Sequence, residues 1–183
     1  MLARMPYVYA AILVLQTIVL AGVYATDPPA PSDPLSVWLG WIAIGSMVSL
    51  LIYSFARRLK RFRDMAKLSY WLHFHIFLGF EGMLSALFHS SHLFTREAAI
   101  VWTNPGVLNF LAVCIVFCSG VFGRWMYGRL PHRTEGGNPE GGGLARVYRY
   151  WIFAHRPMAA ALYLLTFVHI ALAFMFSPTL RHF

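Results

Sequence analysis

Residues 68–94 read LSYWLHFHIFLGFEGMLSALFHSSHLF, and residues 150–176 read YWIFAHRPMAAALYLLTFVHIALAFMF. Each stretch is long and apolar enough for an α-helix to cross about 30 Å of hydrocarbon. Neither stretch alternates polar and apolar residues as a half-buried strand would. Both also hold histidines, which are rare inside membrane-spanning helices. These two segments therefore predict a helical membrane protein whose chemistry lies within the bilayer.

The composition of the whole chain supports this class. Of the 183 residues, 58% are apolar and 12% are charged, whereas soluble domains average about 45–50% apolar and about 25% charged residues. This balance excludes a disordered chain and an ordinary cytosolic enzyme. The two cysteines, Cys114 and Cys118, lie inside an apolar run, which excludes a disulfide framework or a CxxC metal site. We expect both thiols to be buried and inert.

Three further stretches are long and apolar enough to span a membrane, so we expect five spans in all. The loops between them are rich in proline, aspartate and glycine, and no repeat or soluble domain is left over. The first span resembles a secretory signal, but we expect it to be retained as a membrane helix. The expected fold is all-α, a single membrane domain over 1–183, with helices two to five in a four-helix bundle. The five spans are 6–25, 36–55, 68–94, 105–127 and 150–176.

Lysine and arginine indicate the orientation of these spans. Loops rich in these residues remain on the cytoplasmic side of a membrane. Thirteen of the 15 cations belong to one side of the predicted topology, and only Arg96 and Arg181 belong to the other. We therefore expect a multi-pass protein of the cytoplasmic (inner) membrane, with a cytoplasmic N-terminus and an external C-terminus. The net charge of +8 is then explained by topology and anionic membrane lipid, and it gives no reason to expect nucleic acid.

Four histidines in the third and fifth spans share an unusual spacing. His75 and His89 are 14 residues apart, and so are His155 and His169. Fourteen residues turn an α-helix through almost four turns and rise about 21 Å, so both members of a pair face nearly the same way at two depths. Because the two spans run in the same direction, His75 lies level with His155, and His89 lies level with His169. The spacing predicts two stacked sites, each flanked by two imidazoles.

Two imidazoles across an apolar gap suit haem better than zinc, which takes three or four protein ligands. With both axial positions filled, the haem transfers electrons and leaves no place for a gas. No CxxCH is present, so we expect two non-covalent b haems. His75 and His155 would bind the inner haem iron, and His89 and His169 the outer. Further candidates for haem contact, although glycines equally serve close helix packing, are Gly40, Gly45, Gly79, Gly82, Gly120 and Gly123. The arginines placed to pair with the propionates of the inner haem, or to serve as the orientation signal alone, are Arg57, Arg58, Arg124, Arg149 and Arg156.

A known family shares these features. The segment WLHFHIFLGFEGMLSALFH has a glycine four residues after His75 and a histidine ten residues after that glycine. It resembles the third helix of the ferric-reductase-like transmembrane domain, found in ferric reductases, NADPH oxidases and the haem subunit of the methionine sulfoxide reductase system. The fifth span resembles that family's second ligand helix, which implies the same topology and the same four haem ligands. Ile76 departs from the pattern, since a basic residue often follows the first histidine there.

The double pair of histidines also resembles the dihaem cytochromes b of respiratory complexes, including those that anchor nitrate reductases and hydrogenases. Both resemblances imply transmembrane electron transfer by a membrane subunit of a larger oxidoreductase complex. No soluble stretch is long enough for a flavin or nicotinamide domain, so we expect electrons from a flavoprotein, an iron-sulfur or cytochrome c type subunit, or a quinol, with quinone as a further cofactor. The alternative is a transporter or channel whose histidines line a path for a metal ion or protons.

The sequence leaves more than one role open for some other polar residues of these segments. His73 should face away from the ligand face, about 200° round the helix. Glu81 lies between the two haem levels, where an ionised carboxylate is unfavourable, and is either a structural contact or part of a proton path. His92 is an alternative ligand, or it lines an external quinol pocket with Arg96 and Trp102.

Overall fold

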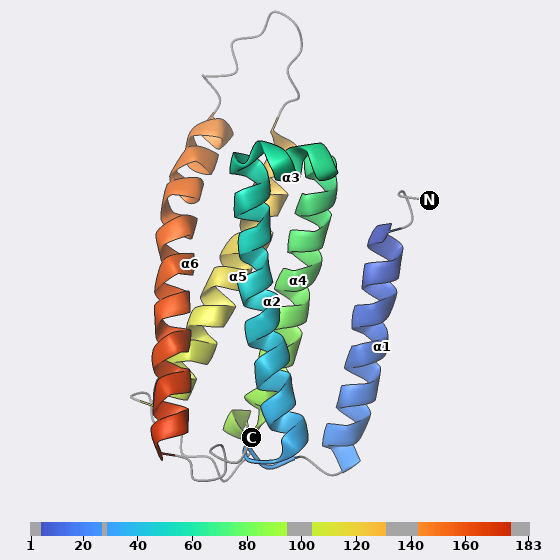
Figure 1. Cartoon of the computed structure of the whole chain (residues 1–183), viewed down its shortest axis with the longest axis vertical. Helices are drawn as coiled ribbons and strands as arrows, with labels where there is room; N and C mark the ends of the chain where they lie inside the picture. The colour runs from blue at the N-terminus through green and yellow to red at the C-terminus, as the bar shows by residue number, and fades with distance from the viewer. Residues whose placement is uncertain (1–4, 27–28, 95–103, 131–142, 177–183) are drawn as a thin grey trace, which may run out of the picture. The chain divides into compact units, whose positions relative to one another are not determined.

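The computed structural model describes residues 5–26, 29–94, 104–130 and 143–176, and every regular element within these ranges is helical (Figure 1). Five of the helices are long and apolar enough to cross a membrane, which confirms the predicted all-α, multi-pass membrane class. They are α1 (Met5–Thr26), α2 (Pro34–Arg58), α4 (Leu68–His89), α5 (Pro105–Arg129) and α6 (Gly143–Phe176). The remaining described elements are a short helix, α3 (Lys60–Met65), and a 3₁₀ turn, η2 (Ser91–Phe94).

Two helix starts follow directly from local sequence. α2 begins at Pro34 and α5 at Pro105, and proline suits the first helical position because its backbone angle is already helical and it has no N–H to satisfy. The side chain of Asn104 accepts a 2.8 Å hydrogen bond from the N–H of Gly106. That N–H is one of those that a helix start leaves without an intrahelical acceptor. These two membrane-spanning helices therefore begin where the sequence signals them.

Two predicted spans differ from the observed helices. The third span is predicted to reach residue 94, but α4 ends at His89 and the chain tightens into η2. Ser90 and Ser91 follow at once, and serine side chains compete with helical hydrogen bonding. The fifth span is predicted to begin at residue 150, whereas α6 begins at Gly143. The additional residues include arginines, which form helices well but interrupt an apolar run.

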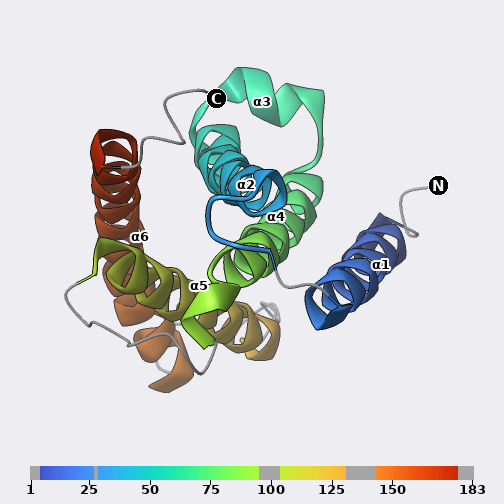
Figure 2. The same ribbon diagram turned by 90° about the horizontal axis from the view of Figure 1, so that it is seen from below.

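The described helices form two units by their internal contacts: α1, α2, α3, α4 and η2 in one, and α5 and α6 in the other. In the first unit α2 and α4 share the largest contact and run antiparallel (Figure 1, Figure 2). In the second unit α5 and α6 are an antiparallel pair. The predicted bundle of helices two to five therefore consists of two antiparallel pairs, and their assembly into one bundle stays a prediction.

A glycine lets α2 and α4 approach closely. A Cβ atom at the buried Gly82 would lie 3.4 Å from the Cβ of Ser46 and 3.6 Å from both the carbonyl oxygen of Ala43 and the Cγ of Met47. Small residues at helix contacts are typical of membrane proteins, because close van der Waals packing replaces the hydrophobic effect as the attraction between helices. Gly82 therefore serves the packing of α4 on α2.

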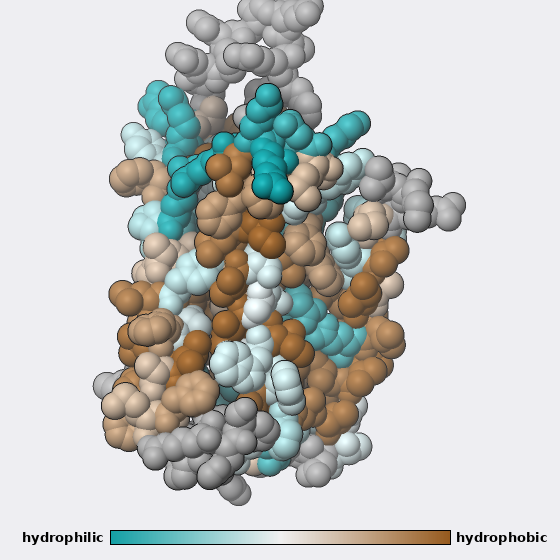
Figure 3. Space-filling view, in the orientation of Figure 1, coloured by the Kyte–Doolittle hydropathy of each residue, from teal (hydrophilic) through white to brown (hydrophobic). Residues whose placement is uncertain are grey.

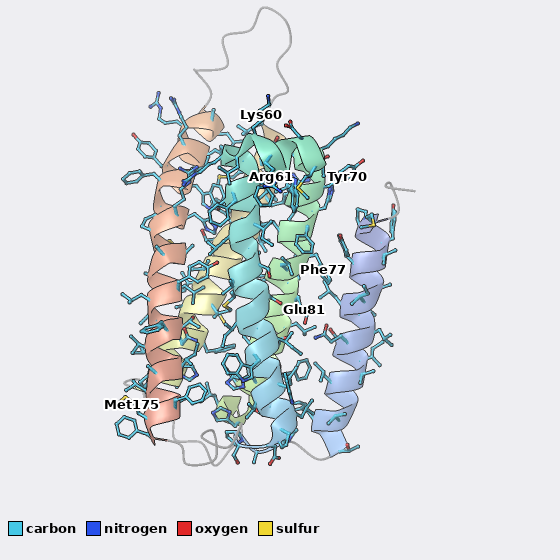
Figure 4. The ribbon with its side chains drawn as sticks, viewed as in Figure 1. Lys60, Arg61, Tyr70, Phe77, Glu81 and Met175 are labelled. Carbon is cyan, nitrogen blue, oxygen red and sulfur yellow. The ribbon has the colours of Figure 1, made fainter. Side chains whose placement is uncertain are left out.

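α1 packs on α4 through an aromatic pair and a polar group. Tyr9 stacks on Phe77 with 4.5 Å between ring centroids. Gln16 donates a 2.8 Å hydrogen bond to the carboxylate of Glu81, which points toward α1 (Figure 4). Ser85 donates to the same oxygen at 2.9 Å. These bonds offset part of the unfavourable placement of a carboxyl group within a span. They support the interpretation of Glu81 as a structural contact.

Apolar side chains cover most of the surface seen along the helices, as expected where lipid is the solvent (Figure 3). Hydrophilic residues gather over α3 and the adjoining end of α2, where Arg57, Arg58, Lys60 and Arg61 are exposed. The expectation of two buried cysteines is wrong for Cys118, whose side chain is exposed on α5. An apolar run in a membrane protein can turn residues outward to lipid, so it does not by itself predict burial.

Replacing Gly82 with leucine should weaken the packing of α2 on α4. The larger side chain must push against Ser46 and Met47, and overpacking of this kind costs about 1–3 kcal/mol. Gly82→Ala should be tolerated, because its Cβ would make ordinary contacts. Gly45→Leu is the matched control, since a Cβ atom there would have open space around it. Thermal unfolding in detergent measures the difference, and equal melting temperatures for the two leucine variants would contradict the prediction.

Candidate functional site

His89 lies on α4 with its ring against α2. Its Nδ1 is 2.8 Å from the backbone carbonyl oxygen of Ser36. A carbonyl oxygen can only accept a hydrogen bond, so Nδ1 carries the proton and donates it. In the neutral ring Nε2 then carries the lone pair, which is the form in which histidine binds a metal. The hydrogen bond therefore prepares His89 to act as a ligand.

Gly40 gives the His89 ring its place beside α2. A Cβ atom at residue 40 would lie 3.1 Å from both Nδ1 and Cε1 of His89, which is tighter than ordinary van der Waals contact. Ser36 and Gly40 are one helical turn apart, so the acceptor and the space for the ring lie on the same face of α2. The sequence marks Gly40 as one of the candidate haem-contact glycines, and its closeness to His89 depends on the packing of the two helices.

His75 repeats this arrangement elsewhere along the same pair of helices. Its Nδ1 is 3.4 Å from the carbonyl oxygen of Leu50, a longer hydrogen bond than that of His89, and its ring lies 5.0 Å from the ring of Tyr53. Ser36 and Leu50 are 14 residues apart, as are His75 and His89. α2 therefore presents two carbonyl acceptors at the same spacing as the two imidazoles of α4. Both helices of this pair therefore carry the 14-residue spacing.

α5 and α6 carry the same period. A Cβ atom at Gly106 would lie 3.3 Å from Cε1 of His169, and one at Gly120 would lie 3.8 Å from Cε1 of His155. The two glycines are 14 residues apart, as are the two histidines. Each histidine of α6 therefore faces a glycine of α5, in antiparallel order. Gly106 was not among the predicted site residues, although its spacing from Gly120 is visible in the sequence.

A buried polar contact stabilises this register between the two histidine levels of α6. The hydroxyl of Thr166 donates a 2.9 Å hydrogen bond to the side-chain oxygen of Asn109. Thr166 is buried, so a shift of one helix along the other would leave its hydroxyl without this acceptor in an apolar setting. The Asn109–Thr166 contact therefore favours the alignment that brings the histidines against the glycines.

His155 has a hydroxyl and an aromatic ring beside it. Its Nδ1 is 3.0 Å from Oγ of Ser119, and its ring stacks on that of Trp151 with 4.9 Å between centroids. The indole N–H of Trp151 donates to the carbonyl oxygen of Ser119 at 2.9 Å and to its Oγ at 3.1 Å. Nothing in the sequence pattern marked Ser119 or Trp151, because a serine and a tryptophan in a membrane span are common.

The structure separates the predicted haem-contact residues into different settings. The four predicted ligands are all half-buried against the neighbouring helix of their own unit. Gly120 lies beside a histidine, whereas residues of the neighbouring helix occupy the space beside Gly82 and Gly123. Gly79 has open space where a side chain would be, and Arg156 is exposed on α6. Gly79 and Gly120 thus leave space near the histidines, and Arg156 places a positive charge beside His155. Gly82 and Gly123 serve the packing of helices.

His73 and His92 lie apart from this pattern. The exposed His73 uses Nδ1 to bond the carbonyl oxygen of Ser69 in its own helix at 2.8 Å, so it faces away from α2 as expected. His92 lies in η2, beyond the end of α4, and burial lowers the pKa of its imidazole below the usual range. The other residues of the predicted quinol pocket, Arg96 and Trp102, lie outside the described residues.

Comparisons of the chain with protein-family models, with curated proteins and with solved structures find no match. Within the described ranges, no three histidine, cysteine, aspartate or glutamate residues group together in a way that could hold a metal ion. The chemistry of the candidate site therefore has to be inferred from the two pairs of histidines and the groups that face them.

Gly40→Ala should disturb the hydrogen bond of His89. The added Cβ would lie 3.1 Å from the imidazole, so the ring or the backbone of α2 must move and the bond to Ser36 must lengthen. Nitrogen-15 NMR of histidine-labelled, haem-free protein reports which ring nitrogen carries the proton. The wild type should show a protonated Nδ1 for His89. In the variant, the chemical shift of Nδ1 should indicate a weaker hydrogen bond to Ser36. Gly45→Ala should change nothing, and an unprotonated Nδ1 in the wild type would refute the assignment.

Proposed function

We propose that this chain is a dihaem b-type cytochrome that conducts electrons across the cytoplasmic membrane as the membrane subunit of a larger oxidoreductase complex. The observation that carries the proposal is the shared 14-residue period. Two imidazoles of α4 match two carbonyl acceptors of α2, and two imidazoles of α6 match two glycines of α5. If these histidines were only isolated helix contacts, the groups that face them would not need to repeat the 14-residue spacing. They repeat it both in the pair α2 and α4 and in the pair α5 and α6.

The nitrogen chemistry of the histidines fits the axial positions of haem iron. His89 and His75 donate from Nδ1 to backbone carbonyls, which leaves the lone pair on Nε2 in the neutral ring. A ligating His155 must hold its proton on Nδ1 in the same way, and the hydroxyl of Ser119 is placed to accept it. Histidine ligands usually donate their second N–H to such a partner, which orients the ring and raises its basicity. His75 and His155 would hold one haem iron, and His89 and His169 the other.

Topology supports pairing one histidine of α4 with one of α6 at each level. Five successive spans alternate in direction, so α4 and α6 cross the bilayer the same way. Their N-terminal histidines, His75 and His155, then belong to the inner site, and His89 and His169 belong to the outer site. The two levels are about 21 Å apart along a helix. This is the arrangement that the resemblance to the ferric-reductase-like transmembrane domain implies.

When bound, the haems would supply one-electron redox centres at two depths of the membrane. The residues of the chain hold and insulate them. Gly79 lies one turn after His75 with open space beside it, and Gly120 faces His155, so both leave room for a flat ring. The exposed guanidinium of Arg156 directly follows His155 and would pair with a propionate. The apolar side chains of these helices would keep water away from the bound haems.

The electron donor we propose is a flavoprotein, an iron-sulfur or cytochrome c type subunit, or a quinol. Anionic lipid would contact the exposed cations around α3, which include Lys60 and Arg61 (Figure 4). The transporter or channel with a metal or proton path is the competing class, and a spectrum separates the two.

The purified protein should show a reduced-minus-oxidised b-type α band and contain two haems for each chain. His89→Ala and His169→Ala should each remove one haem, and the double variant should keep the other, because both ligands belong to one site. Combining His89→Ala with His155→Ala should remove both haems. A pyridine haemochrome assay counts the haem in each variant. This design tests the pairing of ligands as well as the binding of haem.

His73→Ala is the matched control for these variants. His73 is exposed and bonded within its own helix, two residues from His75, so its loss should leave both haems in place. A colourless wild-type protein would overturn the proposal and favour a transport path. Loss of both haems in the variant that lacks His89 and His169 would refute the pairing.

Single cysteines test the proposed orientation. In a Cys114→Ala and Cys118→Ala background, Ser32→Cys should react with a membrane-impermeant maleimide in intact cells, because it lies in the external loop before α2. Asp64→Cys, in the basic α3, should react only after the membrane is opened. Both positions are exposed, so access depends on the side of the membrane. Labelling of residue 64 in intact cells would show that α3 is external, which would contradict the proposed orientation.

A further inference from the structure

The indole of Trp151 restricts the movement of the His155 ring. The two residues are one turn apart on α6, and their rings stack with 4.9 Å between centroids and 25° between planes. Tyr148 also stacks on the indole, at 5.3 Å and 22°. A ring held against a large flat neighbour cannot turn freely about its Cβ–Cγ bond. The stack therefore fixes the plane of the His155 imidazole.

Hydrogen bonds join the same two residues through α5. The N–H of Trp151 is shared between the carbonyl oxygen and Oγ of Ser119, and Oγ also lies 3.0 Å from Nδ1 of His155. A serine hydroxyl has two acceptor sites and one proton, and an indole N–H can only donate. With one acceptor site of Ser119 directed to the indole, the second can accept the proton of Nδ1. Nε2 of His155 then holds the lone pair that a ligand needs.

Gly123 provides the space in which this arrangement forms. It is buried on α5, one turn after Ser119, and a Cβ atom there would overlap the indole of Trp151. Only a residue without a side chain allows the indole to lie this close to α5. Ser119 and Gly123 therefore form a seat for Trp151, and the seat sets where the indole N–H points.

His155 differs from His75 and His89 in the group that faces its Nδ1. Those two histidines donate to backbone carbonyl oxygens, which can only accept a hydrogen bond. The partner of His155 is a hydroxyl, which can either accept from Nδ1 or donate to it. If Ser119 donated its proton to Nδ1, the neutral ring would carry its own proton on Nε2 and could not bind a metal. The tautomer of His155 therefore depends on the direction of the Ser119 proton, whereas the stack on Trp151 sets the plane of the ring.

We infer that Trp151 is a positioning residue that, seated by Ser119 and Gly123, holds the His155 imidazole in the plane of a metal ligand. The inference rests on the proposed function, in which His155 binds the inner haem iron. It gives Gly123 a role in seating Trp151. It also places a side-chain hydroxyl and an indole beside the ligand of the inner site.

Three substitutions test the inference by separate routes. Trp151→Phe keeps an aromatic ring but removes the N–H, Ser119→Ala removes the acceptor, and Gly123→Ala displaces the indole. Each should keep two haems for each chain, shift the low-spin ferric EPR signal of one haem, and leave the other unchanged. Ser119→Ala should also raise the midpoint potential of that haem, because an imidazole without its Nδ1 hydrogen bond donates less strongly to ferric iron.

Trp125→Phe is the matched control. Trp125 is exposed on α5 and stacks on Phe122, outside the network of Ser119, so its replacement should move neither haem signal. Unchanged signals in both Trp151→Phe and Ser119→Ala, with two haems bound, would overturn the inference and leave the proposed function standing. Equal shifts of both haems would overturn it as well, because they would reflect general loosening. A wild type without haem would overturn the proposed function itself.

Discussion

In hydrocarbon every backbone N–H and C=O must be bonded within the chain, and this constraint governs the rest of the structure. It limits the five spans to helices, so a span can place functional side chains on one face only at the helical period. Two groups that must face the same way at different depths of a membrane are then separated by a near-whole number of turns. The spacing from His75 to His89 and from His155 to His169 meets that condition.

The packing of neighbouring helices turns this spacing into a site. An imidazole on a helix surface binds nothing predictable until a second helix supplies an acceptor and enough space. α2 supplies carbonyls at Ser36 and Leu50, and its Gly40 admits the ring of His89. α5 supplies Gly106 and Gly120 in front of the histidines of α6. Helix packing and the position of the histidine rings therefore both depend on glycines, since some glycines of these helices face a histidine and others face packed side chains.

Buried polar contacts align each pair of helices. The Asn109–Thr166 hydrogen bond lies between the levels of the two α6 histidines, and the Gln16–Glu81 hydrogen bond attaches α1 to α4. In membrane proteins one such bond contributes only about 0.6 kcal/mol on average. Its stronger effect is on alignment, because a shifted helix would lose the partner. The carboxyl group of Glu81, which looked like a candidate for proton transfer, has hydrogen bonds consistent with this structural use.

The sequence by itself determined the membrane class, the number of spans and the histidine spacing, because these depend on apolar length and helical period alone. It missed the end of α4 at His89 and the start of α6 at Gly143, where serine and arginine override a count of apolar residues. It did not reveal Ser119, Trp151 or Gly106, since their importance comes from atoms on a neighbouring helix. Only tertiary structure decides such contacts, because a helix face becomes a site through the helix that packs against it.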